Sequence, residues 1–361
     1  LPVLFGAYAA LGLLAPAGAS ASNLLILEQF TEAERPTAFA SFQEMSILGG
    51  VVGGLVGYFW LVDGHPLTEL LVVLAGLAAA SAPIVYLGGL LSGHIATTSA
   101  VTRHPESLAS RLRHSAGAHF VIPFFPRRPT FTFGAGRRLL RWAREELHHV
   151  LPLIFAASLL FNLSANLFNT SYTPYLLSVG VLSSSIFLLN FANNTVQAFA
   201  FPLSGGASLR VGVDRLVAQA TYVRSLGYVA VVGFTFLPLF GGAAFQSNVV
   251  AYSIAGAAIA FYSTASSLIL FRGLHGRDAP NLLGVNSALG GVAAIAGSFL
   301  SGALSEFGGY RLTFLAAAGT LLVSLPLWTA AQVAYAKRRT MQSASATLPP
   351  PAPPAPAVET S

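Results

Sequence analysis

The sequence predicts an all-α protein, a polytopic membrane helix bundle. Of the residues, 54% are hydrophobic and 9% are charged, and apolar runs of about 20 residues recur, each long enough to cross a hydrocarbon core of ~30 Å. The chain also repeats itself: Pro36 and Gly53 have counterparts 244 positions later, in Pro280 and Gly297. An internal repeat in an apolar chain is typical of transporters built from two related bundles.

Nine membrane spans are expected, three before Arg144 and six after it. In order, they cover residues 4–26, 38–61, 70–91, 150–177, 184–203, 216–240, 249–271, 282–304 and 312–334. The chain then divides into a partial N-terminal bundle (1–92), a basic loop with an amphipathic helix (93–149), a six-helix bundle (150–338) and a disordered Pro/Ala-rich tail (339–361).

Basic residues indicate the orientation of these spans. The segment between the two groups of spans is rich in arginine, with Arg103, Arg111, Arg113, Arg127, Arg128, Arg137, Arg138, Arg141 and Arg144. Short basic connections mark the cytoplasmic side, so the central loop and the C-terminus are predicted to be cytoplasmic in a multi-pass protein of the cell membrane. The positive charges therefore report topology and contact with membrane lipid; no nucleic-acid partner is expected.

The same alternation places Leu1 outside the membrane, directly before a span. We expect that three N-terminal helices are missing from this sequence, because the group after Arg144 has six spans and the group before it has three. The rival interpretation is a signal peptide that ends at the small residues Ala15–Ser20. The chain contains no cysteine, so disulfides and thiolate metal sites are excluded, and no metal or cofactor is expected.

These features resemble the major facilitator superfamily over nearly the whole chain: six-helix repeat halves, a long basic central loop and arginine-rich cytoplasmic turns. The segment Ser46–Gly54 (SILGGVVGG) is similar to the glycine-rich motif G-P-x-x-G-G in the fifth helix of proton-coupled antiporters, with Gly50 in place of the proline. The resemblance implies two bundles with the solute held between them, and a monomer. It also implies that the spans at 150–177 and 184–203 line the cavity.

Glycines in the second span are candidates for helix packing or for gating. The set is Gly49, Gly50, Gly53, Gly54 and Gly57. Of these, Gly49, Gly53 and Gly57 recur every fourth residue, and such a stripe lets another helix approach closely. A close seam is also a place where two bundles can rock, so both interpretations stay open.

Glu44 is the acid predicted to lie inside a span, about 10 Å from its start at ~1.5 Å per residue. An acidic side chain in the hydrocarbon region is costly and is usually functional. Its repeat counterpart is Ala288, so the fold does not require an acid at this position. Three interpretations remain: a proton-coupling or substrate role, a hydrogen bond to a neighbouring helix, or a position near the membrane interface.

Amide side chains form the predicted solute site. They follow helical spacing on one face of each of two adjacent spans: Asn162, Asn166 and Asn169 with Thr173 on the first, and Asn190, Asn194 and Gln197 on the second. Neutral donors and acceptors of this kind bind hydroxyl and amide groups, although single amides also join helices to each other. Tyr252 and Tyr262 are expected to form aromatic walls.

The predicted function is secondary active transport of a small organic solute by alternating access, as proton-coupled efflux. The alternatives are an uptake permease for a sugar-like solute, and a solute sensor or nonfunctional transporter remnant. An enzyme is not expected, because neither G-x-S-x-G nor H-E-x-x-H occurs in the sequence.

Overall fold

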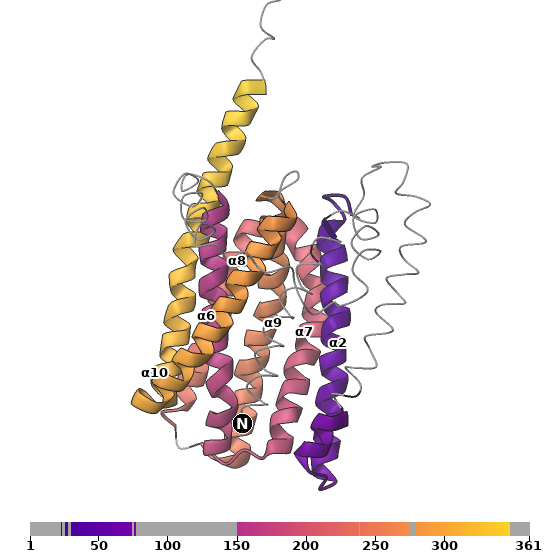
Figure 1. The fold of residues 1–361 in the computed structure, drawn as a ribbon, viewed down its shortest axis with the longest axis vertical. Helices are drawn as coiled ribbons and strands as arrows, with labels where there is room; N and C mark the ends of the chain where they lie inside the picture. The colour runs from indigo at the N-terminus through magenta and orange to yellow at the C-terminus, as the bar shows by residue number, and fades with distance from the viewer. Residues whose placement is uncertain are drawn as a thin grey trace, which may run out of the picture. The chain divides into compact units, whose positions relative to one another are not determined.

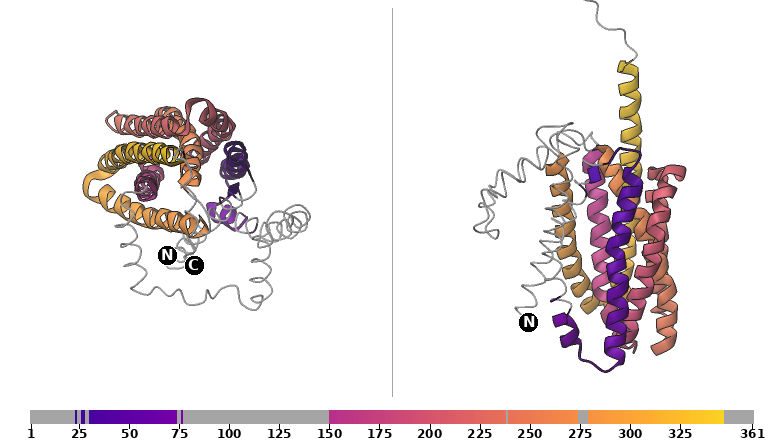
Figure 2. Two further views of the ribbon diagram at one scale, coloured as in Figure 1. Left: turned by 90° about the horizontal axis from the view of Figure 1, so that it is seen from above. Right: turned by 90° about the vertical axis from the view of Figure 1, so that its right-hand side faces the viewer.

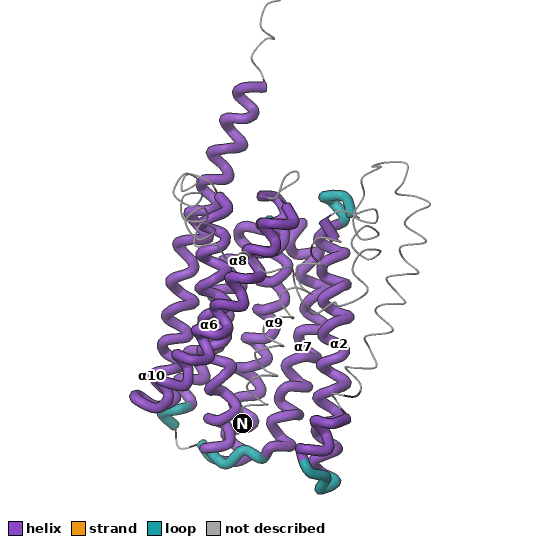
Figure 3. The backbone as a smooth tube through the Cα atoms, in the orientation of Figure 1, coloured by secondary structure: helices purple, strands orange, loops and turns teal. Residues whose placement is uncertain are grey.

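Every regular element in the described part of the chain is an α-helix, as the sequence predicts. The computed structural model describes residues 30–73, 150–237, 239–273 and 279–346, together with Asn23, Ile26, Leu27 and Gly76. Short turns join α6 to α7 and α7 to α8 (Figure 3). The helices are α2 (Arg35–Val62), α6 (Val150–Ser178), α7 (Ser183–Val211), α8 (Val213–Phe234), α9 (Gly241–Gly273) and α10 (Ala279–Ala346).

Four of the described segments are long and apolar enough to cross a membrane, which is compatible with a multi-pass membrane protein. They are Arg35–Val62, Val150–Ser178, Gly241–Arg272 and Leu282–Lys337. Two further helices, α7 and α8, are less apolar, because α7 carries three asparagines and a glutamine and α8 carries Arg224 in its middle.

The observed helices differ from the predicted spans mainly at their ends. α9 begins at Gly241, eight residues before the predicted span at 249, and α8 ends at Phe234, before the predicted end at 240. α10 continues to Ala346, inside the segment predicted to be an extended tail. Its last residues are compatible with a helix, and the prolines that prevent one begin at Pro349. The predicted spans at 4–26 and 70–91 and the loop at 93–149 lie largely or wholly outside the described residues.

The chain forms two compact units. One comprises Leu1–Tyr58 and Glu145–Ser361, and the other comprises Phe59–Arg144. Thus α2 up to Tyr58 belongs with α6–α10, whereas the sequence analysis grouped it with residues 1–92.

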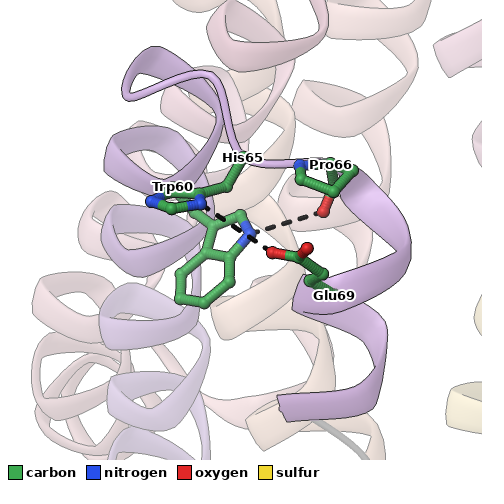
Figure 4. Close-up of polar contacts among 4 residues, drawn as sticks. All are labelled: Trp60, His65, Pro66 and Glu69. Atoms are coloured by element: carbon green, nitrogen blue, oxygen red, sulfur yellow. Dashed lines mark hydrogen bonds and ion pairs between the residues drawn. The ribbon is translucent and has the colours of Figure 1, made fainter.

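The described part of the second unit is a turn between helices (Figure 4). Trp60 Nε1 donates a hydrogen bond to the carbonyl oxygen of Pro66, at 3.4 Å. The ring of His65 lies 4.9 Å from the Trp60 ring, between centroids, and His65 Nδ1 is 3.8 Å from Glu69 Oε2. A tryptophan beside polar groups at the end of an apolar helix suits the membrane–water interface.

α10 consists of two limbs that α6 holds together. Gly309 has φ 72° and ψ 176°, a conformation that favours glycine and that interrupts the helix. The Ser171 hydroxyl on α6 lies 2.6 Å from the Ser301 hydroxyl on the first limb, and Ser164 Oγ donates to the carbonyl oxygen of Ala317 on the second, also at 2.6 Å. Figures 1 and 2 show the helices of this unit running alongside one another.

α2 lies beside α7 in a close seam lined by glycine (Figure 1). A Cβ added at Gly54 would lie 3.0 Å from the backbone of Phe191, and one at Gly50 would lie 2.7 Å from Asn194 Nδ2. The Phe187 ring occupies the space that a Cβ would need at Gly57. Gly49 and Gly53 have no described neighbour within 4 Å of that position. The seam is therefore formed by Gly50, Gly54 and Gly57. The sequence suggested Gly49, Gly53 and Gly57, so the observed face differs by one residue at its first two positions.

α2 begins with a capping arrangement outside the span. The Thr31 hydroxyl and backbone N–H both donate to Glu34 Oε2, at 2.7 and 3.1 Å. The hydrogen bond from the Thr31 side chain, together with that from its backbone, holds the pKa of the Glu34 carboxyl below its usual range. Pro36 follows as the second residue of the helix, where its missing N–H removes no helical hydrogen bond.

The seam between α2 and α7 predicts a specific cross-link. The chain has no cysteine of its own, so the pair Gly50→Cys with Asn194→Cys should form a disulfide under mild oxidation, because the side chains at these positions meet. With a protease site inserted between residues 93 and 149, cleavage should leave the two fragments joined on a non-reducing gel. The pair Gly49→Cys with Asn194→Cys is the control. Equal cross-linking of both pairs, or of neither, would show that α2 docks differently.

Candidate functional site

The predicted amides of α6 point toward the first limb of α10. The amide nitrogen of Asn162 lies 3.9 Å from the position of a Cβ at Gly290, and Asn166 Cβ lies 2.8 Å from that of a Cβ at Gly297. Both asparagines are half-buried, whereas Asn169 and Thr173 farther along the stripe are exposed on the described bundle. The α6 stripe therefore begins in a helix interface and ends on an open face.

Both half-buried amides also bond within their own helix. Asn162 Nδ2 donates to the carbonyl oxygen of Ser158 at 2.9 Å, and Asn166 Nδ2 donates to that of Asn162 at 2.8 Å. Each pairing joins a residue to the carbonyl four positions earlier, a bond that satisfies the amide nitrogen in a membrane helix without needing a second helix. The amide nitrogens of this stripe are thus engaged locally.

Of the predicted amides of α7, Asn194 contacts another helix. Asn194 lies against Gly50 of α2, and Gln197 is buried. Asn190 is half-buried. Since Asn162 and Asn166 face α10 while Asn194 faces α2, the structure does not bring the two predicted stripes together on one wall.

Asn193 is an additional amide that the spacing argument left out. It is 5% exposed, and its Oδ1 fills the space that a Cβ would need at Gly256 of α9. That oxygen has no hydrogen-bond donor among the described residues. Its neighbours Asn190, Asn194 and Gln197 matched the helical spacing, so Asn193 was missed because it lies off that stripe. A buried acceptor without a donor is costly unless a solute or water supplies one.

The two predicted aromatic residues are in the interior, but in separate stacks. The Tyr252 ring is 4.6 Å from that of Tyr172, whose hydroxyl donates to Asn248 Oδ1 at 3.2 Å. Tyr262 is buried and stacks on Phe161, with 3.4 Å between ring centroids. The Tyr262 hydroxyl lies beside Ser158, Ser266 and Trp328, yet it forms no hydrogen bond of good geometry with a described residue.

Arg224 is the charged residue that the sequence analysis passed over. It lies in the middle of α8 and is 2% exposed. Its Nε donates to the Tyr228 hydroxyl at 2.8 Å, and its guanidinium carbon lies 4.7 Å from the centroid of Phe161. The sequence could have identified Arg224 by its position, because it lies nine residues after Arg215 and inside a predicted span. A charged residue inside a membrane span is a candidate functional residue by default.

Glu44 lies on the flank of the α2 face that packs on the bundle. It follows buried Ala40 by four residues and precedes by three Ile47, which packs against Phe201. Glu44 is half-buried, and no hydrogen bond or ion pair joins it to another residue in the described ranges. This carboxyl is placed to meet either the bundle or whatever lies beside α2.

The interior thus combines amides, phenols and a guanidinium within one helical unit. These groups can bind a solute through neutral hydrogen bonds, aromatic stacking and positive charge. No protein-family model matches this chain, and a comparison with curated proteins finds no match.

If the amide stripes bind the solute, replacing one amide should weaken solute binding without a comparable loss of protein stability. In the full-length protein, Asn166→Leu and Asn194→Leu should each weaken solute affinity at least fivefold. The stability should stay within about 1 kcal/mol of the parent, because single hydrogen bonds between membrane helices average ~0.6 kcal/mol. Solute binding and thermal denaturation in detergent measure the two effects.

Thr170→Val is the matched control, because it removes a helix–helix hydrogen bond from Thr170 Oγ1 to Ser298 Oγ (3.1 Å) without touching an amide. Its solute affinity should remain that of the parent. If the leucine variants bind solute normally, or do not fold, the asparagines only join helices.

Proposed function

We propose that this chain belongs to a secondary active transporter that moves a small organic solute across the cell membrane by alternating access. The carrying observation is a set of four buried polar atoms that have no hydrogen-bond partner among the described residues: Asn193 Oδ1, Tyr262 Oη, Asn286 Oδ1 and Trp328 Nε1, all within helices of the bundle. A bundle that only needed to be stable would gain from apolar residues at these positions. Their retention favours binding of a polar solute.

The internal repeat supports a two-bundle organisation of the major facilitator type, with nine spans in this sequence arranged as three plus six. Pro36 and Pro280, which correspond in the repeat, are the second residues of α2 and α10. Both helices also present a glycine to an asparagine of a neighbouring helix, Gly50 to Asn194 and Gly297 to Asn166, although these two glycines are not corresponding positions of the repeat. Corresponding helices that begin alike are expected of two copies of one ancestral unit.

The glycine seam supports movement between the bundles. A face of Gly50, Gly54 and Gly57 carries no side chain that must change rotamer when α2 shifts along α7. Rocking of one bundle against the other about such a seam would expose the solute site to each side in turn. In this arrangement the central loop and the C-terminus are cytoplasmic.

Glu44 is the proposed proton carrier. It lies within a span, half-buried, and the described residues provide no cation to pair with it. A carboxyl in this setting can take up a proton on one side of the membrane and release it on the other when the bundles rock. The direction that we propose is efflux of the solute in exchange for protons.

The same amides also suit a sugar-like solute, so uptake is the second candidate. Vesicles with an imposed pH gradient distinguish the two: solute counterflow that ignores the gradient contradicts proton exchange. A sensor or a remnant would bind solute and transport none.

The substitution Glu44→Gln should abolish the coupling of solute transport to protons and nothing else. The amide keeps the shape of the side chain and carries no exchangeable charge, so proton-driven accumulation of solute in proteoliposomes should fall to the background level. Solute binding and downhill exchange should persist. The matched control is Glu34→Gln, which changes an exposed carboxyl one residue before α2 begins. Uphill transport at the parental rate by Glu44→Gln would exclude Glu44 as the coupling residue.

A further inference from the structure

Arg224 places a permanent positive charge in the interior of the bundle. Arginine remains protonated in proteins, and this one is 2% exposed on α8, a helix that packs among membrane-spanning helices. A charge in such a position is normally balanced by an opposite charge.

No described carboxylate balances this charge. The acid on the same helix, Asp214, is ten residues away, about 15 Å along the helix axis. Glu306 is exposed near the end of the first limb of α10. Within the described ranges, the recorded ion pair is that of His65 with Glu69, far along the chain from α8.

The surroundings of the guanidinium are aromatic. Its carbon lies 4.7 Å from the centroid of Phe161 and 5.2 Å from that of Tyr228. Aromatic faces attract a cation, but they accept no hydrogen bonds in the plane of the guanidinium.

The hydrogen-bonding capacity of Arg224 is largely unused. A guanidinium has five N–H donors in a planar fork, and the recorded bond is that from Nε to Tyr228 Oη. The nearby Tyr262 hydroxyl also lacks a partner among the described residues. This region of the bundle therefore has unused hydrogen-bond donors, and a ligand with hydrogen-bond acceptors would satisfy them.

We propose that Arg224 binds the carboxylate of an aromatic organic acid, which is the solute of the transporter proposed above. A carboxylate supplies two acceptors that match the guanidinium fork and provides the missing negative charge. The rings of Phe161 and Tyr228 beside the guanidinium give the site aromatic surroundings that favour an aryl group. This inference names the solute class of the proposed function and rests on it.

The test uses the full-length protein in detergent and radiolabelled benzoate in equilibrium dialysis, with benzamide as the neutral analogue of the same shape. The parent should bind benzoate at least tenfold more tightly than benzamide. R224Q should lose this preference, with a benzoate Kd at least tenfold above that of the parent.

Arg311 provides the matched control. It also lies over a ring, 4.4 Å from the Phe236 centroid, and its Nε donates to the Thr235 carbonyl oxygen at 3.1 Å, but it is exposed near the break in α10. R311Q should bind benzoate within twofold of the parent. If R224Q does not fold, R224K keeps the charge without the planar fork, and its Kd should rise about tenfold; a parental Kd in R224K would overturn the proposal.

Equal affinity of the parent for benzoate and benzamide, or of R224Q and the parent for benzoate, would overturn the proposal. Displacement of benzoate by an equal concentration of chloride or inorganic phosphate would also overturn it, because the site would then take any small anion. Benzoate binding by a protein that transports nothing would support this site and remove the proposed function. Transport of another solute without benzoate binding would support the proposed function and remove this site.

Discussion

The fold depends on the need to satisfy polar groups where water is absent. In a hydrocarbon environment an unpaired donor or acceptor costs several kcal/mol, so serine and threonine in these helices bond to nearby oxygen atoms. Ser204 and Thr264 join α7 to α9 at 2.7 Å, and Ser301 Oγ donates to the Leu167 carbonyl oxygen at 2.7 Å. These short bonds are possible only where helices approach closely, and small residues at the contacts permit that approach.

Glycine and asparagine act together in this packing. Gly50 receives Asn194, Gly256 receives Asn193 and Gly297 receives Asn166. An asparagine needs space and a bonding partner, and a facing glycine supplies the space without a competing side chain. Where the second requirement is unmet, as at Asn193 Oδ1, the helix interface contains an unused acceptor. That combination of a tight fit and an open hydrogen-bonding site connects the packing of the bundle with its proposed solute binding.

The interior also contains two kinds of electrostatic environment. Around α6, α8 and α9, Arg224 and the tyrosines form a donor-rich region that favours a negative solute group. On α2, Glu44 lies at the flank of the glycine seam. In the proposed mechanism Arg224 would bind the solute and Glu44 would carry the proton, so a change at one residue would affect one process without the other.

The sequence alone determined the class of the protein, because the length and frequency of apolar runs follow directly from the thickness of a membrane. It also located most helices of the described part, including α6 and the break between the limbs of α10, since apolar period and punctuation are local properties. The tertiary structure decided which faces meet. Gly50, Gly54 and Gly57 form the seam and Gly49 and Gly53 do not, because rotation of α2 is set by its contacts with Phe187, Phe191 and Asn194 on α7. Only the structure showed that Asn166 and Asn194 face different helices and that Arg224 lies among aromatic rings, because residues far apart in sequence define those surroundings.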